Sequence, residues 1–141
     1  MLSALNDSGA EYLVVGAHAI GTYSTPLATG DFDIWVRPTR ENAERVWAAL
    51  EKFGAPRRKL TIDDLCTPDN MYQIGVAPNR IDILTSITGV GFDEAWSNRT
   101  ESQIDGIMVS VIGRTELLKN KRAAGRPKDL ADVAWLEQSE S

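Results

Sequence analysis

The 141 residues have an ordinary globular composition, 43% hydrophobic and 25% charged, and we expect one domain over 1–141. A net charge of -5 argues against non-specific nucleic-acid binding over the whole surface, and the single cysteine, Cys66, excludes an intrachain disulfide. No apolar run approaches the roughly 18 residues of a membrane span, and the N-terminus lacks a signal-peptide pattern. We therefore expect a cytoplasmic protein with no membrane contact.

The first part of the chain predicts a helix over 2–8, a strand over 11–15 and a strand over 31–36. Pro38-Thr39 opens the clearest helix, and Gly54 ends it. Its apolar residues recur at helical spacing: Ala43, Val46, Trp47, Leu50 and Phe53.

The remainder predicts further strands and ends in helices. The expected elements are a helical turn over 61–65, strands over 70–76 and 80–84, a short helix over 92–96, a hairpin of strands over 99–104 and 107–112 around Asp105-Gly106, and helices over 115–124 and 127–138. This order predicts an α/β (α+β) fold, a mixed β-sheet flanked by helices, with a C-terminal helical segment over about 114–138.

Three aspartates stand out on the predicted strands. Asp31 and Asp33 are two residues apart, so they project from the same face, and Asp82 is the polar exception between Ile81 and Ile83. Two carboxylates about 4 Å apart repel by roughly 4 kcal/mol at an effective dielectric of 20, and a divalent cation removes that cost. Hard oxygen ligands favour Mg²⁺, which assists phosphoryl transfer. The alternative is that all three are solvated on an exposed sheet face.

Two further features fit an anionic ligand. Gly16 follows the first strand, and a small-residue turn there can direct backbone N–H groups at a phosphate, although it also fits a plain strand-to-helix turn. The segment from Arg114 to Lys128 holds six basic residues and one acidic residue, Glu116. It indicates either a local anion site or a solvated helix face.

The four tryptophans are expected in or near the core: Trp35, Trp47, Trp96 and Trp135. Because Trp35 shares the carboxylate face of its strand, stacking on a nucleotide base is the alternative for that residue.

Taken in order, these motifs resemble the DNA polymerase β nucleotidyltransferase superfamily. They are a strand ending in Val15-Gly16-Ala17, the Asp31-Phe32-Asp33 motif, and Ile81-Asp82-Ile83. The run from Lys121 to Asp132 is similar to the K…R-x-K-D-x-x-D motif of the small bacterial branch related to AbiEii-type toxin nucleotidyltransferases.

The resemblance implies a minimal nucleotidyltransferase fold, with a five-stranded mixed sheet and the site at one edge. It implies that Asp31, Asp33 and Asp82 bind Mg²⁺ and that Asp82 helps to activate the attacking hydroxyl. Gly16 and Ala17 would hold the triphosphate, and Asp129 or Asp132 would orient the cations that contact phosphate or base. Those cations are Lys121, Arg126 and Lys128.

The implied activity is transfer of a nucleoside monophosphate from a nucleoside triphosphate to an acceptor hydroxyl on RNA, protein or a small molecule, within a toxin–antitoxin system. A partner protein or a homodimer would supply the acceptor-binding surface. Ala17 and Leu27 depart from the family pattern, and this leaves an inactive nucleotide- or partner-binding module as one alternative. A metal-dependent phosphohydrolase is the other.

Overall fold

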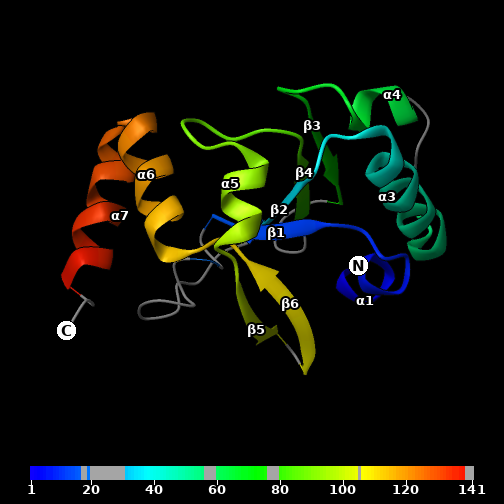
Figure 1. The fold of residues 1–141 in the computed structure, drawn as a ribbon, viewed down its shortest axis with the longest axis horizontal. Coiled ribbons are helices and arrows are strands. Elements are labelled where there is room, and N and C mark those ends of the chain that lie inside the picture. The colour runs from blue at the N-terminus through cyan, green and yellow to red at the C-terminus, as the bar shows by residue number, and fades with distance from the viewer. Residues whose placement is uncertain (17–18, 20–30, 56–59, 76–79, 105, 139–141) are drawn as a thin grey trace.

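A computed structural model describes the chain except residues 17–18, 20–30, 56–59, 76–79, 105 and 139–141, and the side chain of Asp31. The described residues form a mixed six-stranded sheet in the order β3-β4-β2-β1-β6-β5, with helices around it (Figure 1). The predicted fold class is confirmed, although the sheet has six strands rather than five. No helix among the described residues has the length and apolarity to cross a bilayer.

The elements follow the predicted order closely. The structure gives α1 Leu2–Asp7, β1 Tyr12–Val15, β2 Asp31–Val36, α3 Arg40–Phe53, α4 Ile62–Leu65, β3 Met71–Ile74, β4 Arg80–Leu84, α5 Phe92–Ser97, β5 Thr100–Ile104, β6 Ile107–Val111, α6 Arg114–Ala124 and α7 Pro127–Gln138.

Helix α3 illustrates how local sequence sets these bounds. The hydroxyl of Thr39 accepts a hydrogen bond from the backbone N–H of Asn42, which satisfies one of the unpaired donors of the first turn. Gly54 ends the helix at φ 82°, a left-handed conformation that glycine adopts without strain. Between them, the apolar stripe buries Val46 and Leu50 completely.

Strand β2 lies in the interior of the sheet, between β1 and β4. It is antiparallel to β1 and parallel to β4, so the start of β2 and the start of β4 meet at the same end of the sheet as the end of β1. One face of β2 carries Ile34 and Val36, which are fully buried. The other face carries the predicted carboxylates.

Most of the helices form two groups on opposite sides of the sheet, and α5 lies between these groups (Figure 1). Helices α1, α3 and α4 gather on one side, and the α6–α7 pair on the other, beyond the end of β1. Strand β6 is parallel to β1 and leads directly into α6. The C-terminal helices therefore begin at the end of the sheet where Val15 and Gly16 lie.

Candidate functional site

The strand register brings two of the predicted carboxylates together. Asp33 on β2 lies opposite Asp82 on β4, and in parallel strands directly opposite residues project from the same face. Neighbouring strands are about 4.8 Å apart, so two carboxylates here are close enough to bind one cation. Asp82 is 6% exposed, which makes an unneutralised negative charge costly.

Gly16 packs directly against Asp33. It follows Val15, the register partner of Asp33, and has φ 72°. A Cβ atom placed on Gly16 would lie 2.3 Å from Oδ2 of Asp33, closer than any real contact. A residue with a side chain would therefore fit here only if the Asp33 carboxylate moved. The phosphate-binding role expected of Gly16 stays a prediction, and Ala17, His18 and Leu27 lie outside the described residues.

Asp31 opens β2 and lies opposite Arg80 in the register. Its side chain is not among those that the structure describes, so the expected set of three carboxylates is tested only for Asp33 and Asp82. Among the described side chains, no group of three or more His, Cys, Asp or Glu could hold a metal ion. Asp33 and Asp82 supply the hard oxygen donors that Mg²⁺ prefers, and Mg²⁺ commonly needs only one or two protein carboxylates in addition to substrate phosphates.

Arg80 is a site residue that the sequence motifs did not single out. Its Nε lies 3.3 Å from Oδ1 of Asp82, and its side chain is 33% exposed. The pattern Arg80-Ile81-Asp82 could have indicated this contact, because residues two apart on a strand project from the same face.

These carboxylates lie on the interior strands β2 and β4, not on an edge strand, so the expected position at a sheet edge is wrong. The physical reason is that β3 pairs with β4 on the far side from β2 and covers what would otherwise be the edge.

The second predicted group of residues, on α6 and α7, forms a network of ion pairs. Nζ of Lys121 lies 3.5 Å from Oδ1 of Asp129 and 3.2 Å from Oδ2 of Asp132. Lys121 and Asp129 are both buried. Lys121 therefore holds the two helices together and is not a solvated residue.

Arg126 also binds Asp129, but from the surface. Its Nε donates a 2.6 Å hydrogen bond to Oδ2 of Asp129, while its own side chain is 73% exposed. This bond is the main reason that the pKa of Asp129 lies below its ordinary value, against the burial that acts to raise it. The same bond raises the pKa of Arg126. Asp129 thus pairs with Arg126, and the expected role of this pair toward phosphate or base stays a prediction.

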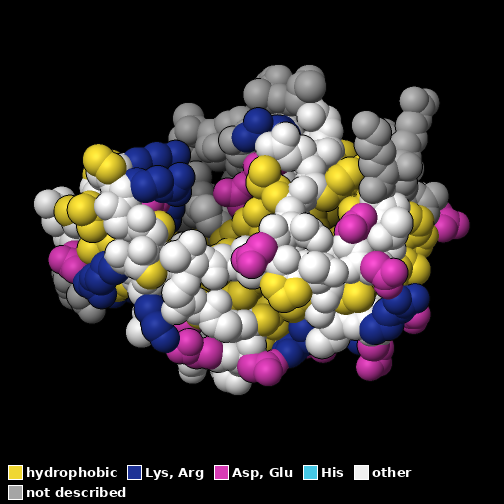
Figure 2. Space-filling view, turned by 90° about the horizontal axis from the view of Figure 1, so that it is seen from above, with side chains coloured by type: hydrophobic (Ala, Val, Ile, Leu, Met, Phe, Trp, Pro, Cys, Tyr) yellow, Lys and Arg dark blue, Asp and Glu magenta, His cyan; other side chains and the backbone are white. Residues whose placement is uncertain are grey.

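Arg114 is partly buried and donates a hydrogen bond to the Leu136 carbonyl, whereas the remaining basic residues of this segment are at the surface. Lys119 contacts Glu94 and Arg122 contacts Glu137, each with about half of the side chain exposed, and Lys128 is exposed. Figure 2 shows Lys and Arg side chains gathered over α6 and α7, next to a hollow on the same face of the molecule. In this segment Lys121 is buried and joins α6 to α7 through ion pairs, and the exposed basic side chains form a cationic surface.

The core position expected of Trp35 is confirmed and its alternative, stacking on a base, is not, whereas the core position expected of Trp135 is wrong. Trp35 lies on the carboxylate face of β2 but is 1% exposed, because Phe92 of α5 packs on it edge to face with ring centroids 5.0 Å apart. It belongs to the core and has no face left for a base. Trp135 is 44% exposed on α7 and is not part of the core.

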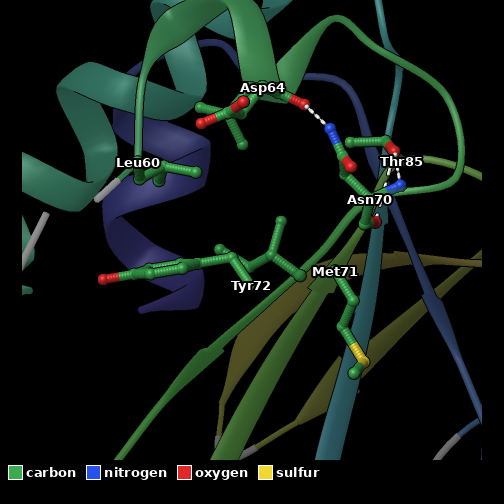
Figure 3. Close-up of a pocket in the computed structure, with 8 residues that line it drawn as sticks. Leu60, Asp64, Asn70, Met71, Tyr72 and Thr85 are labelled. Carbon is green, nitrogen blue, oxygen red and sulfur yellow. Dashed lines mark hydrogen bonds between the residues drawn. The ribbon is translucent and has the colours of Figure 1, made fainter.

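A groove of about 280 Å³ lies elsewhere, beside α4 and β3 (Figure 3). Its polar groups bond to one another: the Asn70 side chain donates to the Asp64 carbonyl and the Asn70 N–H donates to the Thr85 hydroxyl. It contains none of the predicted site residues. These bonds between its polar groups hold α4 against the strands.

Comparison with known proteins supports the fold. No family model and no curated protein matches the sequence. A solved structure from Thermotoga maritima, described as "a putative nucleotidyltransferase", superposes with a TM-score of 0.64 at 12% sequence identity, over 97% of this chain and 88% of that one. The chain therefore has a nucleotidyltransferase-like fold.

Proposed function

We propose that this protein is a magnesium-dependent nucleotidyltransferase, which moves a nucleoside monophosphate from a nucleoside triphosphate to an acceptor hydroxyl. The observation that carries the proposal is the meeting of Asp33, Asp82 and Gly16. Two carboxylates lie opposite each other at the end of a sheet, and the turn after β1 packs on one of them without a side chain. The nucleotidyltransferase-like fold agrees with this chemistry but does not by itself establish it.

In this proposal Asp31, Asp33 and Asp82 hold magnesium. The metal would neutralise charge on the phosphates and lower the pKa of the attacking hydroxyl. Asp82, the most buried of the described pair, would lie closest to the acceptor and help to remove its proton.

The backbone of Gly16 and Ala17 would contact the triphosphate, which needs the close approach that a missing side chain allows. Among the cations, Arg126 and Lys128 are the better candidates for phosphate, because their side chains reach the surface. Lys121 would act by holding α6 to α7, since two carboxylates already balance its charge.

The family resemblance favours RNA or protein as the acceptor, within a toxin–antitoxin pair in which a partner protein or a second copy completes the surface. An acceptor screen therefore includes RNA, protein and small hydroxyl compounds.

The test is calorimetric titration of each NTP with Mg²⁺ or EDTA, followed by a pyrophosphate-release assay. We expect Mg²⁺-dependent binding of an NTP and release of pyrophosphate, both lost in Asp33→Asn and in Asp82→Asn. Asp63→Asn is the matched control, because Asp63 is an exposed aspartate that also pairs with an arginine, Arg40.

Each other outcome contradicts the proposal in a different way. Binding without pyrophosphate release favours the binding module. Loss of NTP with no modified acceptor favours a hydrolase. No binding of any NTP refutes the site itself.

A further inference from the structure

Arg80 occupies a position that a metal site would not be expected to tolerate. It lies two residues before Asp82 on the same strand face and opposite Asp31 in the register. A permanent positive charge is thereby built into the cluster of carboxylates proposed to bind Mg²⁺.

The contact with Asp82 is electrostatic. Nε of Arg80 is 3.3 Å from Oδ1 of Asp82, and that oxygen accepts no hydrogen bond from the described residues. The Asp82 side chain is 8% exposed, so water screens the pair poorly. The guanidinium thus faces one of the two Asp82 oxygens that could bind a cation.

We propose that Arg80 is an internal counter-ion, which competes with the metal for Asp82 until nucleotide binds. It neutralises Asp82 in the ligand-free protein and disfavours metal binding there. When a triphosphate brings its negative charge, the same arginine is attracted to the phosphates and leaves Asp82 to the metal. Arg80 would then couple metal binding to nucleotide binding. This inference rests on the proposed function.

The sign of the effect follows from the charges. A divalent cation bound to Asp82 would lie within a few ångströms of the guanidinium, and repulsion between the two is strong in a poorly screened site. Arg80 also orders the Asp82 side chain, which helps metal binding, but fixing one short side chain is a small effect by comparison. Loss of the charge should therefore strengthen metal binding.

The experiment is Mn²⁺ titration of the full chain by calorimetry without nucleotide, for wild type, Arg80→Gln and Arg80→Lys. Arg40→Gln is the control, since Arg40 is an exposed arginine paired with Asp63. We expect Arg80→Gln to bind Mn²⁺ roughly tenfold more tightly or better, and the other two variants to stay near wild type. In a second titration with a saturating non-hydrolysable NTP analogue, the gain should shrink.

Unchanged or weaker Mn²⁺ binding by Arg80→Gln, with wild type binding Mn²⁺, refutes the counter-ion role and leaves the proposed function intact. The same holds if the gain is equal with and without the analogue. Absence of Mn²⁺ binding in wild type and in every Arg80 variant, both with and without the analogue, refutes both. If Arg80→Gln loses its far-UV circular dichroism, the neutral Arg80→Met takes its place in both titrations, with the same expected and the same refuting results.

Discussion

Replacement of Gly16 by alanine tests whether the turn after β1 and the Asp33 carboxylate form one unit. Gly16 has φ 72°, and its added Cβ would meet Oδ2 of Asp33 at 2.3 Å. Two costs follow, one from the backbone conformation and one from the displaced carboxylate.

The cost of the backbone conformation and the cost of displacing the carboxylate can be measured separately by comparison with a second glycine. A left-handed conformation costs a residue with a side chain about 1–2 kcal/mol. Moving Asp33 off its rotamer adds about 0.5–1.5 kcal/mol. Gly9 has φ 71°, but nothing lies within 4 Å of its added Cβ, so Gly9→Ala carries only the first cost. We therefore expect Gly16→Ala to lower the free energy of unfolding by about 1.5–3.5 kcal/mol and Gly9→Ala by about 1–2 kcal/mol.

Urea unfolding measures the stability of both variants, and calorimetry measures their Mg²⁺-dependent NTP binding. Gly9→Ala should bind as wild type does, whereas Gly16→Ala should lose binding because Asp33 is displaced. Equal stability and equal binding in the two variants would refute the reasoning.

Three further predictions concern stability. Asp129→Asn removes the negative charge that pairs with Arg126 and with buried Lys121, so it should lower the free energy of unfolding by about 3 kcal/mol. Because the pKa of Asp129 is lowered in the fold, wild type should lose this stability as the pH falls below about 4. Urea unfolding from pH 7 to 3 checks both, and a flat wild-type profile would contradict the assignment. Trp35→Ala should cost about 3–5 kcal/mol and exposed Trp135→Ala under about 0.5 kcal/mol, a difference that thermal unfolding resolves. Burial raises the pKa of Tyr12 to about 12 from its ordinary 10.0, so the fold should lose up to about 3 kcal/mol as the pH rises from about 10 to 12, and Tyr12→Phe should abolish that slope.

Local patterns predicted the elements well. The alternation from Asp31 to Val36 predicted β2 with its observed bounds, and the interval from Thr39 to Gly54 predicted α3. Both depend on periodicity and on end residues, which act within a few residues of sequence.

The pairing of distant strands, and the burial of side chains by distant helices, could not be predicted from local patterns. The alternation placed Trp35 on the same face as Asp33, but only the packing of Phe92 from a distant helix decides that one is buried and the other lies in the site. The register of Asp33 with Asp82 is also set across the sheet. Lys121 belonged to a run of basic residues, and only the fold shows that two carboxylates from α7 enclose it.

The pairing of β2 with β4 also bears on how the site comes into being. The two strands are distant in sequence, so their ladder forms only after a long loop has closed, a step that slows folding. Until then Asp33 and Asp82 are separate carboxylates on a flexible chain, and neither alone binds a divalent cation strongly. A newly made or partly unfolded molecule would therefore lack the paired carboxylates, and the proposed metal site would form only with the completed fold.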